Sequence, residues 1–314
     1  MAHAPREPIV LDNGSGFLKG GLASADEPSK VIPVITGKRS GWSSLFVGED
    51  ARKPMVHAFH PVEKGLVQDW GHMEVIWEHM LYTQLKVKEG EHPVLLTEIP
   101  SSPDSQREAM TQIFFEQFCV PALHIGMQPA LSVISMDQSC GLVVDSGETM
   151  TQICPVHNYQ SLTPNARRFE VGGRHITEWL MRNMTGQGLY LEPSSSRDMD
   201  HTRKMKEALC YVAEDFDKEI SIARTSSAVD ATFTFCDGRK IGICQERFNA
   251  TEVLFNPKPL GVFTDGLPEQ IDNCIKSTSP KIQEELYDSV LLTGGNSKLG
   301  GKYCTITDSS KVTI

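Results

Sequence analysis

The sequence predicts an α/β protein with two domains, and three observations support this prediction. The chain has 314 residues, which is long for one compact core and indicates two domains. Short aliphatic runs typical of buried strands occur at 93–96, 141–144 and 290–292. Stretches with apolar side chains at helical spacing lie between these runs, so strands and helices are expected to alternate.

Three amphipathic helices are expected in those stretches. One runs from Met73 to Leu85, and a second begins after Ser102 with Pro103 tolerated in its first turn. A third is expected to continue from Met205 to Phe216. Their apolar stripes should pack on sheets: Met73, Ile76, Trp77, Met80, Leu81 and Leu85; Met110, Ile113, Phe114 and Phe118; Met205, Leu209, Val212 and Phe216.

Two aspartates each follow an apolar strand and precede a turn of small residues. Asp12 lies in Pro8-Ile-Val-Leu-Asp-Asn-Gly-Ser-Gly16, and Asp145 lies in Gly141-Leu-Val-Val-Asp-Ser-Gly147. Consecutive backbone N–H groups in such turns form a nest that binds an anion, most often phosphate. A carboxylate beside phosphate needs a cation between them, so each aspartate predicts a hard metal ion such as Mg²⁺, held through water.

One such turn is also typical of a solvated hairpin, but two copies predict a clamp around one nucleotide. Lys19 follows Gly16 closely enough for its ammonium to reach a terminal phosphate. The alternative for Lys19 is an ordinary solvated surface side chain. The repetition favours the nucleotide interpretation.

Further motifs identify a family resemblance. Asp12-Asn-Gly-Ser-Gly-x-x-Lys19-x-Gly resembles the first phosphate loop of the actin family, and Asp145-Ser-Gly resembles the start of its second. Other matches follow in the family's order from about residue 8 to residue 301. They lie at 91–98, 110–113, 173–174, 206–213, 246–248 and 293–295. The chain thus resembles a divergent actin or actin-related protein.

The resemblance implies a two-lobed fold of the actin, Hsp70 and sugar-kinase ATPase type with a central nucleotide cleft. The first lobe is expected at 1–135 and the second at 136–314. Within the first lobe, 1–33 and 61–135 form the core, and 34–60 form a small outer subdomain. Within the second, 136–171 and 262–314 form the core, and 172–261 form the outer subdomain.

The resemblance also implies roles for individual residues. Asp12 and Asp145 are expected to face a hydrated metal ion, and Gln128 to orient the attacking water. The implied cofactor is ATP or ADP with Mg²⁺, and Ca²⁺ is an alternative. Further expected nucleotide contacts are Gly14, Ser15, Gly16, Lys19, Ser146, Gly147, Gly173, Lys206, Glu207, Gly294 and Gly295.

Each carried-over role has a structural alternative. Lys206 and Glu207 also fit a solvated helix face, and Gln128 fits a satisfied polar group before a proline. Gly294 and Gly295 also fit a plain strand-to-helix turn. The preserved order and spacing of the motifs favour the functional roles.

Several positions depart from the family pattern in the second phosphate loop and beside the adenine. Glu148 and Thr149 replace Asp and Gly, Gln152 replaces a catalytic-site histidine, and Leu299 replaces a tyrosine near the adenine. Glutamate adds a methylene, and threonine brings a β-branched side chain where glycine lets the backbone approach phosphate. We therefore expect the second loop to be displaced and Gln152 to be the third catalytic-site residue.

Two further departures concern the outer loop and the C-terminus. The loop between Gly37 and Phe46 is shorter than the family's, which removes most of the segment that reaches a neighbouring subunit in a filament. After Gly301 the sequence carries no family pattern and stops early, as a C-terminally truncated member would. That shortening is expected to leave apolar faces partly uncovered on the Trp77 and Phe114 helices.

Composition narrows the function classes. A net charge of −10 argues against direct nucleic-acid binding or an anionic membrane as the main partner. The eight cysteines form no C-x-x-C pair, so zinc and disulfide frameworks are not expected. No apolar run has the length of a membrane span and no signal-peptide core follows Met1, so we expect a cytoplasmic, cytoskeletal protein without membrane insertion.

Three functions remain open at this point. The first is an actin-like, ATP-binding cytoskeletal protein with weak or absent hydrolysis and impaired self-polymerisation, so that it is at most a slow ATPase. The second is a non-polymerising actin-related regulatory subunit or degenerate truncated pseudo-actin. Both would have nucleotide, actin or actin-binding proteins as partners. A small-molecule kinase on the same fold is the third, but it gives no reason for the matches at 91–98 and 206–213.

Overall fold

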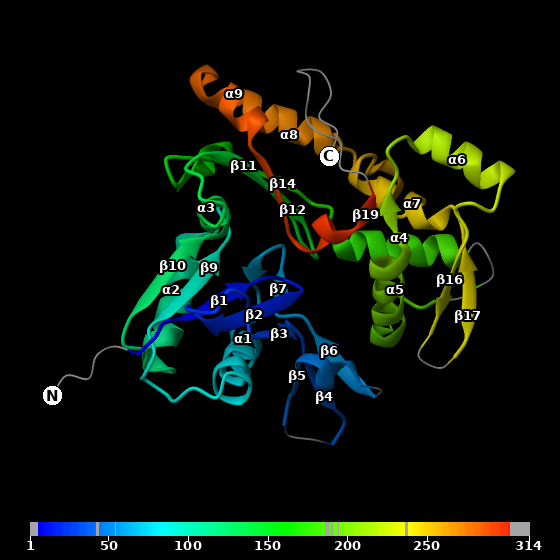
Figure 1. Cartoon of the computed structure of the whole chain (residues 1–314). Helices are drawn as coiled ribbons and strands as arrows, with labels where there is room; N and C mark the ends of the chain where they lie inside the picture. Colours follow the sequence, from blue (N-terminus) through cyan, green and yellow to red (C-terminus); the bar gives the residue numbers. More distant parts are fainter. Residues whose placement is uncertain are drawn as a thin grey trace. The chain divides into compact units, whose positions relative to one another are not determined.

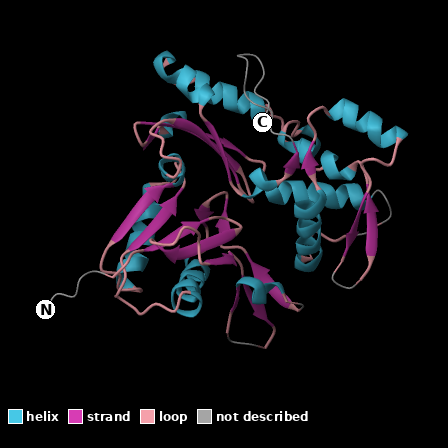
Figure 2. Ribbon diagram, viewed as in Figure 1, coloured by secondary structure: helices cyan, strands magenta, loops and turns pink. Residues whose placement is uncertain are grey.

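The computed structural model describes residues 6–41, 44–53, 55–185, 189, 191–193, 195–235 and 238–301. The described part divides into two compact units, one drawn from 1–139 and 156–164 and the other from 140–155 and 165–314. Strands and helices alternate through both units (Figure 1 and Figure 2), which confirms the α/β class. The finer subdomain boundaries given above stay a prediction.

The first unit is built on a five-stranded sheet of order β10-β9-β1-β2-β3. β1, β9 and β10 are parallel, while β2 returns antiparallel to β1 through the turn at 14–16. The carboxyl ends of the three parallel strands therefore lie along one edge of the sheet. The bounds are β1 Ile9–Asn13, β2 Phe17–Leu22, β3 Lys30–Pro33, β9 Val94–Glu98 and β10 Leu123–Met127.

Helices α1 (Trp70–Glu78) and α2 (Asp104–Glu116) cover this sheet, and α3 (Gln128–Ile134) follows β10 directly. The chain continues past α1 as a π-helical segment, His79–Gln84, so the predicted 73–85 stripe is confirmed, with its residues up to Leu81 buried. Pro103 is the N-cap of α2 and lies outside its first turn, which corrects the prediction.

Two of the large rings on the helices that were expected to have partly uncovered faces are buried. Trp77 and Phe114 are both 0% exposed, and their ring centroids lie 5.1 Å apart in an edge-to-face arrangement. Such a pair adds about 1 kcal/mol beyond the burial of its area. Phe115 of α2 is 45% exposed, so an apolar side chain of the Phe114 helix is partly uncovered, as expected for that helix.

Small sheets complete the first unit. β4 pairs with β5 and β6 in order β5-β4-β6, and β7 pairs with β8. Residues 42–43 of the shortened loop lie outside the described residues. The bounds are β4 Thr36–Arg39, β5 Phe46–Val47, η1 Gly48–Arg52, β6 Val56–Phe59, β7 Val62–Glu63 and β8 Leu66–Val67.

A second sheet has the order β13-β12-β11-β18, with β14 also paired to β12. β11 and β18 are parallel, and both were predicted as buried strands from their aliphatic runs. β11 is buried along most of its length, whereas β18 is half-buried throughout, which corrects the prediction for β18. The bounds are β11 Gly141–Ser146, β12 Thr151–His157, β13 Gln160–Ser161, η3 Thr163–Asn165, β14 Arg167–Phe169 and β18 Val290–Thr293.

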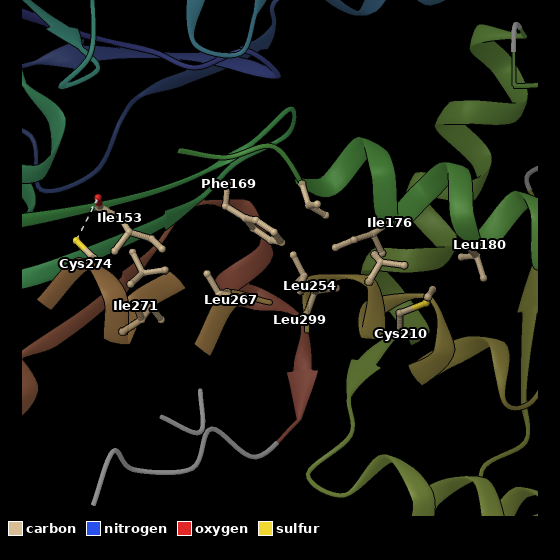
Figure 3. Packing of buried hydrophobic residues seen from close by; sticks show 14 of the residues in the cluster. Ile153, Phe169, Ile176, Leu180, Cys210, Leu254, Leu267, Ile271, Cys274 and Leu299 are labelled. Carbon is tan, nitrogen blue, oxygen red and sulfur yellow. Dashed lines mark hydrogen bonds between the residues drawn. The ribbon is translucent and has the colours of Figure 1, made fainter. Parts of the chain in front are cut away.

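Helices pack on one face of this sheet and enclose the core of the second unit. Figure 3 shows Ile153 and Phe169 from the strands against Ile176 of α4 and Ile271 of α8. No helix within the described ranges is long and apolar enough to cross a membrane. The remaining bounds are α4 Gly173–Thr185, α5 Ser196–Leu209, β15 Tyr211–Val212, α6 Phe216–Thr225, β16 Ala231–Thr234, β17 Lys240–Ile243, α7 Glu246–Asn249, η4 Thr251–Leu254, η5 Lys258–Leu260, α8 Leu267–Lys276, α9 Pro280–Asp288, η6 Gly295–Lys298 and β19 Gly300–Gly301.

The third predicted helix is wrong beyond Leu209. The backbone of Cys210 is extended, and Val212 lies in β15, which pairs with β19. A new helix, α6, then begins at Phe216, because the Asp215 side chain accepts a hydrogen bond from the Lys218 N–H and caps it. The apolar residues that suggested one helix therefore keep helical spacing only by chance, because α5 and α6 are separate helices.

Glu252 in η4 gives the second unit a testable pH dependence. Burial and the like charge of Asp217 raise the pKa of its carboxyl from 4.5 to about 7. The folded state therefore retains a proton that the unfolded state releases, so this contribution is fully present below pH 4.5 and is lost as pH rises through about 7.

We expect Glu252→Gln to remove this loss and to raise the free energy of unfolding at pH 8 by on the order of 1–2 kcal/mol, with little change at pH 4.5. Thermal unfolding at both pH values measures it. Glu214→Gln, at an exposed site, is the matched control. Equal pH dependence in the parent and Glu252→Gln proteins would contradict this account.

Candidate functional site

The first candidate half-site is the turn between β1 and β2. Asp12 and Lys19 are directly paired across the two strands, and the Lys19 Nζ lies 2.7 Å from Asp12 Oδ2. Inside the turn the Gly14 N–H donates to the Phe17 carbonyl at 3.1 Å. A Cβ on Gly14 would lie 2.7 Å from that carbonyl oxygen, so the turn requires glycine there.

The second oxygen of the Asp12 carboxylate is held by two donors from neighbouring strand ends. Thr97 Oγ1 donates to Asp12 Oδ1 at 2.7 Å, and Gln128 Nε2 donates to it at 3.0 Å. Burial alone would raise the pKa of the Asp12 carboxyl, but the Lys19 charge and these hydrogen bonds together lower it. Asp12 is therefore a carboxylate at neutral pH, as a metal-facing group must be.

Gln128 lies beside Asp12, as the sequence predicts. Its Nε2 also lies 3.1 Å from the Asn13 carbonyl and 3.2 Å from Thr97 Oγ1. The Asn13 side chain in turn accepts from Trp77 Nε1 at 3.0 Å, which ties the turn to the core of the unit.

Ser15 and Gly16 make internal contacts. Ser15 Oγ accepts a hydrogen bond from the Gly65 N–H at 3.0 Å, and the Gly16 carbonyl accepts from the Val34 N–H at 3.0 Å. These bonds connect the turn to the 62–67 hairpin and to the chain after β3. The turn is therefore fixed by residues on several sides.

The second candidate half-site is the hairpin between β11 and β12. The Gly147 N–H donates to the Met150 carbonyl at 3.0 Å and closes the hairpin. Counting back along both strands places Gln152 opposite Asp145 on one face of the sheet. Neither Glu148 nor Thr149 has a positive φ, so the β-branched Thr149 fits this turn without left-handed backbone.

Gln152 is 3% exposed, and neither polar atom of its amide has a hydrogen-bond partner within the described residues. Leaving a buried amide unsatisfied costs about 1–3 kcal/mol per group, so such a side chain favours a bound water or a polar ligand. Asp145 and Gln152 together thus offer a carboxylate and an unused amide side by side.

Ser146 and Gly147 are held from the turn after β18. Asn296 Nδ2 donates to Ser146 Oγ at 3.1 Å and to the Gly147 carbonyl at 2.9 Å. The two glycines of that turn differ. Gly294 has φ of +86°, and a Cβ there would lie 2.3 Å from the Ser146 carbonyl oxygen, whereas a Cβ on Gly295 would meet nothing within 4 Å. Only Gly294 is sterically required.

Gly173 and Lys206 are in contact, whereas the Glu207 side chain binds Arg203 instead. Lys206 is 3% exposed and its Nζ donates to the Gly173 carbonyl at 2.9 Å. Burial lowers the pKa of Lys206 despite the attraction of Glu148. Glu207 accepts two hydrogen bonds from Arg203 Nη1, at 2.8 and 3.0 Å, on a half-exposed helix face.

Leu299 lies in the hydrophobic core of the second unit (Figure 3) and is 5% exposed. Its side chain therefore packs within this core.

Sequence reasoning missed Thr97, Asn296 and Arg203. A usable signal existed for Thr97, because it stands at the carboxyl end of a strand next to β1, where side chains of neighbouring parallel strands meet. Asn296 and Arg203 gave no such signal, because their roles depend on which turn and which carboxylate the fold brings near them.

A comparison with protein families agrees with the motifs. The family model described as Actin matches the chain over residues 4–199 and 194–302. These ranges contain every candidate residue described above.

Proposed function

This chain belongs to the actin family, and on that premise we propose that it is an ATP-binding, actin-like protein of the cytoplasmic cytoskeleton. Its hydrolysis of ATP is slow or absent, and its assembly into filaments by itself is impaired. One observation carries the proposal: each unit has a strand-end aspartate beside a tight turn, with a glutamine amide next to it. Actin or actin-binding proteins are the proposed partners.

The residues present fit a magnesium nucleotide. Asp12 in the first unit and Asp145 in the second would each face a hydrated ion, and the turns at 14–16 and 146–147 would each face phosphate. Bound Mg²⁺ supplies positive charge that neutralises the phosphate oxygens. Lys19 pairs with Asp12 and is exposed enough to exchange that carboxylate for a terminal phosphate.

We expect Asp12→Ala and Asp145→Ala each to weaken binding of a fluorescent ATP analogue with Mg²⁺ at least about tenfold, equivalent to 1.4 kcal/mol. Each loses a charge that holds the metal. Asp26→Ala, at an exposed aspartate, is the control and should leave affinity unchanged. Unchanged affinity in both site variants would show that ATP binding does not use these turns.

Slow hydrolysis follows from the groups that would orient water. In the family a glutamine and a histidine share this task, so the chemistry depends on positioning more than on a strong base. Gln128 is retained, while Gln152 offers an amide that cannot take up a proton near neutral pH as imidazole can.

We expect Gln152→His to raise single-turnover phosphate release, and Glu148→Asp combined with Thr149→Gly to raise it further. A 1 Å error in position can cost on the order of a hundredfold in rate. ATP affinity measured in parallel separates binding from chemistry. If no variant gains rate over the parent, these substitutions are not the cause of slow turnover.

Impaired assembly is the part of the proposal that the β4–β5 hairpin supports. β4 ends at Arg39 and β5 begins at Phe46, so residues 40–45 connect these paired strands. Such a connection reaches at most about 3.5 Å per residue. The same observation favours the second candidate, a non-polymerising actin-related regulatory subunit.

Sedimentation in Mg²⁺ and moderate salt tests assembly. We expect the protein to remain in the supernatant under conditions in which conventional actin, the control, forms a pellet. Co-sedimentation with actin that polymerises in its presence, compared with preformed filaments, then separates the two candidates. A filament-joining protein would enter the pellet chiefly in the first case, whereas a non-polymerising subunit would enter it in both cases or in neither. An ordered polymer of this chain alone would overturn the assembly argument.

A further inference from the structure

Three polar side chains converge on Gly173, the first residue of α4. A Cβ at this position would lie 2.9 Å from Asn296 Oδ1, 3.0 Å from Glu148 Oε2 and 3.0 Å from Lys206 Nζ. Because the last two atoms lie at that distance from the same point, they are at most about 6 Å apart. The absent side chain of glycine is what allows a carboxylate and an ammonium to approach each other here.

Lys206 needs an opposite charge at this place. Its side chain is almost wholly buried and donates one identified hydrogen bond, to the Gly173 carbonyl, whereas an ammonium has three donors. Of the acidic groups around it, Glu148 does most to favour its charged form. A buried ammonium without such a partner is strongly unfavourable.

The backbone of the Glu148 turn is anchored at the same place. The Gly147 carbonyl accepts from the Gly173 N–H at 2.9 Å, and the Glu148 carbonyl accepts from the Arg174 N–H at 2.7 Å. The turn thereby satisfies the first free N–H groups of α4. A charge on Glu148 therefore acts where the hairpin, α4 and α5 meet.

We propose that Glu148 and Lys206 form an internal charge pair that keeps the second half-site assembled when no nucleotide is bound. The glutamate's extra methylene, relative to the aspartate of the family pattern, extends its carboxylate toward Lys206. The pair is part of the chain itself, so this inference does not depend on whether ATP binds.

The test is thermal unfolding of the full chain freed of nucleotide by EDTA and apyrase. Glu148→Gln leaves Lys206 buried without its opposite charge and should lower the Tm by about 5–10 °C. Glu148→Asp keeps the charge but retracts it, so we expect about half that shift. Glu207→Gln, one residue from Lys206 on the same helix but half exposed, is the control and should shift the Tm by less than about 2 °C.

A double-mutant cycle identifies the pair. Lys206→Met removes the ammonium, so adding Glu148→Gln to it should cost far less than Glu148→Gln costs in the parent protein. Additive shifts would overturn the proposal, as would a Glu148→Gln shift no larger than that of Glu207→Gln. If Glu148→Gln is too unstable to purify, Glu148→Asp takes its place in the same cycle. ATP affinity, measured separately, reports on the proposed function independently of this result.

Discussion

The need to satisfy a carboxylate at the end of a buried strand organises the first unit. Asp12 follows aliphatic residues of β1, and its Oδ1 accepts from Thr97 and Gln128, which stand at the ends of β9 and β10. All three parallel strands, in the order β10-β9-β1, must therefore come together before this carboxylate makes its hydrogen bonds. Because Lys19 lies across the hairpin on the other carboxylate oxygen, the charge is balanced before any ligand arrives.

The turn of the second unit is held in a different way. Its turn is closed by a hydrogen bond between Gly147 and Met150 and is held from outside by Asn296. Gly294 permits this contact because any Cβ would strike the Ser146 carbonyl. Among the residues that the structure describes, the Gln152 amide beside it has no partner for its donors or its acceptor. The two half-sites thus differ physically, since the amide of the first is engaged and that of the second is not.

The sequence pattern predicted those helices and strands whose formation depends on residues near one another in the chain. The stripe from Met73 to Leu81 and the aliphatic runs of β9, β11 and β18 were recognisable, because side-chain periodicity follows directly from helix and strand geometry. The break at Cys210 was missed because pairing between β15 and β19 depends on residues far away in the chain. The hydrogen bond from Lys206 to the Gly173 carbonyl depends on tertiary contacts in the same way. The sequence motif predicted Lys206 as a site residue but not this contact.

The departures in the second turn do not require a left-handed backbone. The hairpin around Glu148 and Thr149 closes without left-handed residues, so these substitutions need no distorted turn. In the proposed function, their effect would come from the positions of the Glu148 carboxylate and the Thr149 side chain and from how the Gln152 amide orients a water. In the proposed function, Asp12 and Asp145 would supply the charge that faces a metal ion, whereas Gln128 and Gln152 would orient the water for hydrolysis. On this proposal, nucleotide binding and ATP turnover would depend on different residues, so that turnover could be lost while binding is kept.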